Sequence, residues 1–263
     1  MRARRPSRRV RAHSRGAFLG AVALALAFAA PVARADAVVV YAAGAAREAV
    51  LRLVPIVAQA TGDEIVPTFD TVGALRDRVL AGERPDVVVL SAAAVDTLVS
   101  RGAVARDSVR PVGDVVVGLA VRRGAPLPDI STSEALARTL VGAPSIAYAD
   151  PARGATAGTH FAAVLDRLGV RADVAPRASV LPFGVEVVEA VAQGRVALGV
   201  SQSSEIVQHP GVSYAGGLPP PHALATGYAL APLSGRASGA RVAAVLAGPL
   251  GLAAFRETGF AAR

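Results

Sequence analysis

The chain has 263 residues, 52% of them hydrophobic, and no cysteine. The lack of cysteine excludes a disulfide scaffold, a thiolate metal site and a cysteine nucleophile. All 28 basic residues are arginine, so a Walker A lysine and a Schiff-base lysine are excluded as well. The net charge of +8 depends on the first 35 residues, which hold eight arginines and no acid; the remainder has 20 basic and 20 acidic residues. This balance does not predict a nucleic-acid-binding surface.

The first 35 residues predict a cleaved secretory signal peptide. An arginine-rich stretch precedes an apolar segment from Ala17 to Val32, and Ala33-Arg34-Ala35 fits an A-x-A cleavage site. A retained membrane anchor is the alternative, although the apolar segment is short for a membrane span. The pair Arg8-Arg9 leaves the twin-arginine export route open beside the general one. We therefore expect a periplasmic protein whose mature chain begins at residue 36.

Strands and helices alternate in the first half of the mature chain. Runs of β-branched residues predict the strands, and apolar residues at spacings of 3, 4 and 7 predict the helices. Residues 86–91 contain the uninterrupted apolar run Val87–Leu90, which is typical of a parallel strand buried on both faces. The predicted elements are strand 37–42, helix 46–60, strand 64–69, a helix from about 72 that ends at Gly82, strand 86–91 and helix 92–100.

A long strand separates this half from a second alternating set. Residues 113–124 are long for a strand and contain Gly118, which indicates a strand that crosses between two lobes. A later strand, 226–233, is a candidate to pair with it. The alternation predicts an α/β protein with parallel sheets. The other predicted elements are strand 145–150, helix 157–168, helix 185–193, strand 196–202 and helices 236–247 and 250–257.

Four predicted strand-to-helix junctions are rich in small or hydroxyl residues. Ligands of open α/β sheets bind outside the carboxyl ends of the strands, where the N–H groups of the following helices point outward. Small residues at one junction indicate only a tight turn, but four junctions in two predicted lobes favour a shared cleft. The junctions are Ala43-Gly44-Ala45, Thr71-Val72-Gly73, Thr156-Ala157-Gly158 and Ser201-Gln202-Ser203.

Four sequence blocks, in this order, resemble the molybdate-type periplasmic solute-binding proteins of ABC importers. The resemblance implies a two-lobe type II periplasmic binding protein fold, with parallel-rich sheets, flanking helices and a two-strand hinge. We expect lobe 1 to contain residues 36–115 and 228–263, and lobe 2 residues 116–227. A monomer that delivers its ligand to an inner-membrane ABC permease is also implied. The blocks are YAAGAAREAV, FDTVGALRDRVLAGERPDVVVLSA, IAYADPARGATAGTHFAAVLDRLG and VEAVAQGRVALGVSQSSE.

The resemblance places ligand-binding positions at helix N-termini of both lobes. They fall at Ala45, Val72, Ala157, Gly184 and Gln202. The family pattern has serine at the first two positions and often tyrosine at the last, so three side-chain donors are absent from this chain. Backbone N–H groups and the dipole of a helix N-terminus would still attract an anion. Neighbouring residues complete the predicted site: Gly44, Thr71, Thr156, Gly158, Val185 and Ser201.

Two kinds of ligand stay open at this stage. The first is a molybdate-like oxyanion, held by backbone N–H groups and by the hydroxyls that neighbour the lost donors. The second is a small organic acid in the larger pocket that Ala45 and Val72 leave, clamped by the guanidinium group of Arg76 or Arg153. In either case the ligand is small and anionic.

The sequence shows no catalytic constellation. The stretch GVSQS (199–203) departs from the nucleophile-elbow pattern at its last residue. The carboxylates Asp70, Asp150 and Glu186 show no spacing typical of an acid/base pair, and no metal-ligand spacing is present. We therefore expect a binding protein without enzymatic activity, cofactor or metal site. A sensor or scaffold without transport is the third class considered.

Overall fold

The structure, a computed structural model, describes residues 36–233 and 235–262, which belong to one compact unit. The predicted signal peptide and its cleavage site lie outside these residues. Within the described part of the chain, no single helix is long and apolar enough to cross a membrane. One bent pair meets that test by length and composition, α9 (Ala237–Ala247) followed by α10 (Pro249–Glu257) at 57°.

A nine-stranded sheet organises the chain, in the order β2-β1-β3-β9-β4-β7-β5-β6, with β8 paired to β4. β1 is parallel to β2 and β3, and β5 is parallel to β6 and β7. The strands are β1 (Ala37–Ala43), β2 (Glu64–Asp70), β3 (Val87–Ser91), β4 (Arg110–Arg122), β5 (Ile146–Ala149), β6 (Ala178–Leu181), β7 (Leu198–Gln202), β8 (Val212–Gly217) and β9 (Ala225–Pro232).

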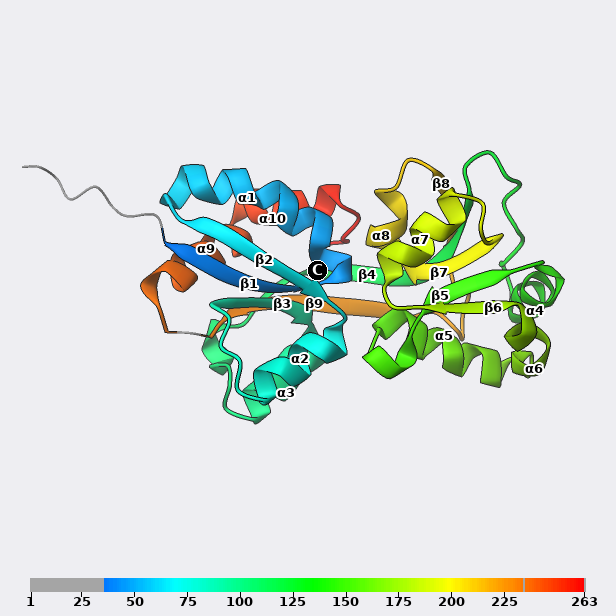
Figure 1. Ribbon diagram of the computed structural model, residues 1–263, viewed down its shortest axis with the longest axis horizontal. Helices are drawn as coiled ribbons and strands as arrows, with labels where there is room; N and C mark the ends of the chain where they lie inside the picture. The colour runs from blue at the N-terminus through cyan, green and yellow to red at the C-terminus, as the bar shows by residue number, and fades with distance from the viewer. Residues whose placement is uncertain (1–35, 234, 263) are drawn as a thin grey trace, which may run out of the picture. The chain divides into compact units, whose positions relative to one another are not determined.

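β4 is the long strand that connects the two halves of the sheet (Figure 1). Its residues 110–116 pair with β9, and its residues 117–121 pair with β7. Both the crossing and the pairing with the later strand were expected from the sequence. The sheet is mixed rather than wholly parallel, because β4 and β9 run antiparallel to each other and to their neighbours.

Helices cover both faces of the sheet. In Figure 1, α1, α9 and α10 cover one face of the β2-β1-β3-β9 half, while α2 and α3 cover the other. In the other half, α7 and α8 lie on one side and α5 on the opposite side. The remaining helices are α1 (Arg47–Thr61), α2 (Val72–Leu80), α3 (Ala92–Ser100), α4 (Ser133–Gly142), α5 (Thr156–Arg167), α6 (Arg171–Val174), α7 (Gly184–Ala192) and α8 (Ser203–Val207), with a 3-10 turn η1 (Gly44–Ala46) before α1.

The buried apolar residues form three clusters. One cluster combines residues from Val38 to Val115 with residues from Tyr228 to Phe260. The other two contain residues between 117 and 218, and they lie around β5 and β7. The lobe boundaries predicted from the sequence stay a proposal, which the change of cluster between Val115 and Val117 supports.

Gly158 allows α5 to pack closely on β5. A Cβ atom at this position would lie 1.7 Å from the carbonyl oxygen of Ala149. The helix can approach the strand this closely only because residue 158 has no side chain.

We expect Gly158→Ala to destabilise the protein by about 1–3 kcal/mol, because the added methyl group forces α5 away from β5. Gly142→Ala is the matched control, since Gly142 ends α4 and a Cβ atom there meets nothing within 4 Å. Urea denaturation of both variants measures the difference. Equal free energies of unfolding for the two variants would contradict this role of Gly158.

Candidate functional site

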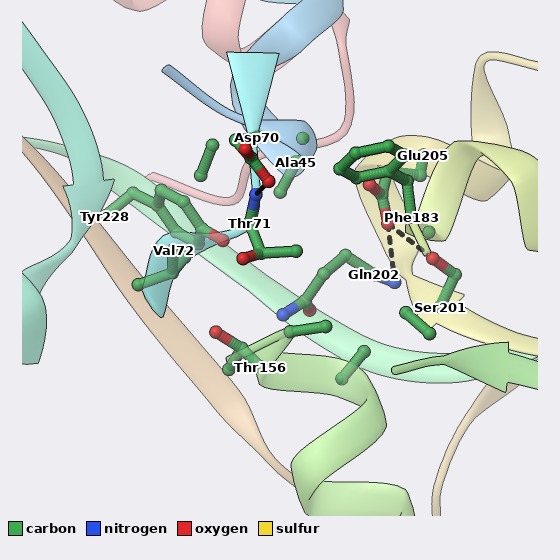
Figure 2. Close-up of a pocket in the computed structure, with 16 residues that line it drawn as sticks. Ala45, Asp70, Thr71, Val72, Thr156, Phe183, Ser201, Gln202, Glu205 and Tyr228 are labelled. Atoms are coloured by element: carbon green, nitrogen blue, oxygen red, sulfur yellow. Dashed lines mark hydrogen bonds between the residues drawn. The ribbon is translucent and has the colours of Figure 1, made fainter. Parts of the chain in front are cut away.

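A pocket with a cavity volume of about 40 Å³ lies where the four small-residue junctions meet (Figure 2). The ends of β1, β2 and β7 and the starts of η1, α2, α5 and α7 contribute to its wall. Residues from all three apolar clusters therefore face one cavity. Nine of the residues predicted from the sequence line it: Gly44, Ala45, Thr71, Val72, Thr156, Ala157, Gly184, Ser201 and Gln202.

Three helix starts at this pocket carry no side-chain cap. Their N-cap residues are Ala43 before η1, Ala155 before α5 and Phe183 before α7, and none of these has a polar side chain. The first N–H groups of a helix have no acceptor within the helix, and they carry the positive end of its dipole. Without a serine, threonine or aspartate cap, these N–H groups can donate to a bound anion.

The hydroxyls near the pocket are mostly engaged by the protein itself. Thr71 caps α2 by accepting from the N–H of Ala74 (3.2 Å), and its hydroxyl donates to the carbonyl of Arg153. The Ser201 hydroxyl donates to the carboxylate of Glu205. Of the three hydroxyls predicted to contact the ligand, that of Thr156 alone has no hydrogen bond within the described residues.

Residues 70–73 touch residues 153–154 at the edge of the pocket, and we call this the rim contact. The Gly73 N–H donates to the Gly154 carbonyl (3.1 Å), and Arg153 pairs with Asp70 (3.1 Å). The Arg153 guanidinium also lies 4.8 Å from the centre of the Phe183 ring. Arg153 thus belongs to the rim rather than to the pocket wall.

The other predicted residues lie outside the pocket wall. Arg76 pairs with Asp77 at 2.8 Å. Gly158 packs against β5, as described above, and Val185 lines two neighbouring cavities together with Gly44 and Arg47. Neither guanidinium group that was predicted as a clamp lines the cavity wall.

Glu205 is a buried carboxyl that the sequence analysis did not single out. Its carboxylate accepts hydrogen bonds from the Ser201 hydroxyl and from the Gln202 N–H (3.3 Å). It fits between two glycines: Cβ atoms on Gly44 and Gly184 would lie 2.7 Å and 2.2 Å from its oxygens. Burial raises the pKa of Glu205, and the hydrogen bonds from Ser201 and Gln202 oppose this rise.

Tyr228 and Phe183 are two further lining residues that the sequence analysis missed. Burial and then the nearby charge of Glu205 raise the pKa of Tyr228. Asp70 also lines the cavity, and it was considered only as a catalytic carboxylate. Glu205 had a local signal, since it stands three residues after an N-cap position. Tyr228 and Phe183 had none.

The positive electrostatic potential in the cavity comes from backbone N–H groups at the helix starts rather than from basic side chains. Among the described residues that line it, none is arginine, lysine or histidine, whereas Asp70 and Glu205 are acidic. His160, one turn into α5, hydrogen-bonds instead to the carbonyl of His222 (2.8 Å). An anion in the cavity would therefore interact mainly with the uncapped helix starts.

Comparison with known proteins relates the whole described chain to one family. A family model described as bacterial extracellular solute-binding protein matches residues 38–261. The periplasmic molybdate-binding protein of Azotobacter vinelandii has a TM-score of 0.69 at 18% identity, covering 86% of this chain and 99% of that chain. The sulfate-binding protein of Mycobacterium tuberculosis H37Rv has a TM-score of 0.67 at 16% identity, covering 86% of each chain. At these identities the two structures show the shared two-lobe fold.

A curated relative bears an enzyme's name. Aconitate isomerase of Pseudomonas sp. is 36% identical over 151 residues, which is 57% of this chain and 56% of that protein. The match thus spans about half the length of the relative.

The rim contact depends on two glycines, Gly73 and Gly154, which approach each other closely. A Cβ atom on Gly73 would lie 2.7 Å from the Cα of Gly154. Gly73→Ala should leave α2 intact, since alanine is the better helix former, but should push the two segments apart. We expect a larger radius of gyration by small-angle X-ray scattering than for the parent or for Gly142→Ala. An unchanged radius of gyration would contradict the expectation that the rim contact holds residues 70–73 and 153–154 together.

Proposed function

The chain belongs to the family of bacterial extracellular solute-binding proteins, and from this premise we propose that it captures a small anion for an ABC importer. One observation supports the proposal: three uncapped helix starts, from both halves of the sheet, line one small cavity. Backbone N–H groups at helix starts favour negative charge without any basic side chain. The predicted leader supports capture in the periplasm, followed by delivery to an inner-membrane permease.

The size of the cavity favours a small ligand. A volume of about 40 Å³ suits a ligand of few atoms, since one ordered water needs roughly 10–15 Å³ by the same measure. A molybdate-like oxyanion is of this kind, and a small organic acid is the alternative. The clamp by Arg76 has no support in the geometry, and Arg153 is engaged by Asp70.

Capture would act by closure of the two lobes around the ligand. A ligand that contacts the helix starts of both lobes stabilises the closed state by its higher affinity for that state. The rim contact joins residues on the two sides of the pocket, so it belongs to the closed state. A permease would then distinguish the closed, loaded protein from the open one.

Thr156 offers a test of the backbone donors. It is the first residue of α5, where proline is tolerated but removes an N–H group. We expect Thr156→Pro to bind molybdate, or whichever small anion binds best, about 10- to 100-fold more weakly than Thr156→Ala does. Isothermal titration of both variants measures this, and the alanine variant controls for the lost hydroxyl. Equal affinity of the two would contradict anion capture by this helix start.

Isomerase activity is a second candidate function, favoured by the buried carboxyl in the pocket. Glu205 has the raised pKa of a general acid or base, and the aconitate isomerase relative shares 36% identity over part of the chain. Isomerisation of an unsaturated tricarboxylate can proceed by removal and return of a carbon-bound proton, which such a group can perform. The candidate ranks second because the small cavity has no basic side chain in its described lining for three carboxylates.

Incubation of the purified protein with cis-aconitate, followed by NMR, tests the second candidate. If the candidate is correct, trans-aconitate accumulates, and Glu205→Gln slows the reaction by roughly 100-fold or more. Glu189→Gln is the control, since Glu189 pairs with His209 outside this pocket. No isomerisation above the protein-free rate would eliminate this candidate.

A further inference from the structure

The Gln202 side chain is buried in the pocket without a hydrogen-bond partner. It is 3% exposed, and neither Oε1 nor Nε2 has a partner within the described part of the chain. Gln202 is the N-cap of α8 in a capping-box arrangement with Glu205, yet its amide makes no cap hydrogen bond. Figure 2 shows the side chain extending into the pocket, away from Glu205. A buried amide of this kind is unfavourable unless a ligand completes its hydrogen bonds.

A ligand that satisfies this amide must both accept and donate. Whichever way the amide is turned, it presents one acceptor oxygen and one NH₂ donor. A fully ionised tetrahedral oxyanion carries acceptors alone. Such an ion can accept from Nε2, but it leaves Oε1 unpaired and facing negative oxygens.

The rest of the wall also contains hydrogen-bond acceptors. A fully ionised anion cannot use them, because it has no hydrogen to donate. The carboxyl groups of Asp70 and Glu205 both line the cavity. The Ser201 hydroxyl cannot donate to a ligand while it donates to Glu205. The donors that remain are the backbone N–H groups at the uncapped helix starts, the Thr156 and Tyr228 hydroxyls and Gln202 Nε2. Negative charge at one end of the ligand and a hydroxyl at another would match this distribution.

We infer that the ligand of this pocket is a small anion that also carries an O–H group, either a hydroxycarboxylate or a protonated oxyanion such as hydrogen phosphate. The inference rests on the proposed function and narrows its ligand class. The charged end binds the helix starts, and the O–H group donates to Gln202 Oε1. Molybdate and sulfate, which lack an O–H group at neutral pH, are then poor ligands.

Two matched pairs of anions test the inference by isothermal titration of the purified protein at pH 7. Hydrogen phosphate is compared with sulfate, and lactate with propionate. We expect the O–H-bearing member of at least one pair to bind tenfold or more tightly than its partner. A preference within the first pair alone identifies the ligand class as an inorganic oxyanion, and within the second alone as a hydroxycarboxylate.

Two results would overturn the inference. If sulfate and propionate bind as tightly as their partners, this inference fails while anion capture stands. If none of the four anions nor molybdate gives binding heat, the proposed anion capture fails, and this inference fails with it.

Variants at position 202 test whether the Gln202 amide causes the preference for the O–H-bearing anion. Gln202→Met keeps the side-chain length and removes both polar atoms, so the preference should fall to within twofold. Gln193→Met is the control, because Gln193 is an exposed residue at the C-terminal end of α7, outside the pocket lining. If Gln202→Met does not fold, Gln202→Glu serves instead: it keeps an acceptor and loses the donor, so the preference should persist while both affinities fall. Retained preference in Gln202→Met, or its loss in Gln202→Glu, would contradict the assignment.

Discussion

Three helix starts without side-chain caps surround one small cavity, and this arrangement explains the other features of the site. Ala43, Ala155 and Phe183 precede η1, α5 and α7 and have no oxygen with which to cap them. Capping residues at such positions typically contribute about 1 kcal/mol each. Capping residues are absent from three helix starts that face the same cavity. A bound ligand would explain this, because its oxygens would accept hydrogen bonds from the free N–H groups. The small residues at the strand ends then serve to let that ligand reach the backbone.

Glycine residues, which have no side chain, let the two sides of the pocket approach each other. Glu205 fits beside Gly44 and Gly184, and Gly73 meets Gly154 at the rim. Larger residues at these positions would hold the segments apart. β4 meanwhile runs through both halves of the sheet, so the connection between them is a continuous strand. A protein built in this way can close on a small ligand without large side chains in the cleft.

The frame of the site was predictable from the sequence, whereas its chemistry was not. Small residues after β-branched runs are a local pattern, and the structure brings all four such junctions to one pocket. The antiparallel direction of β4 and β9 left no such local pattern, although the remaining strand pairs are parallel, in agreement with the expected parallel-rich fold. Short or half-buried elements such as β6 were not predicted, because four residues give little periodicity. The unpartnered amide of Gln202 and the position of Tyr228 depend on packing between distant segments, which no local pattern reports.

A crystal structure with bound hydrogen arsenate, an anomalously scattering oxyanion that carries an O–H group, would show directly whether the uncapped helix starts hold an anion. We expect an arsenic peak in the cavity, with arsenate oxygens about 2.9 Å from backbone nitrogens at the starts of α5 and α7. Arsenic peaks confined to surface arginines, with the cavity empty in the same crystals, would contradict this expectation.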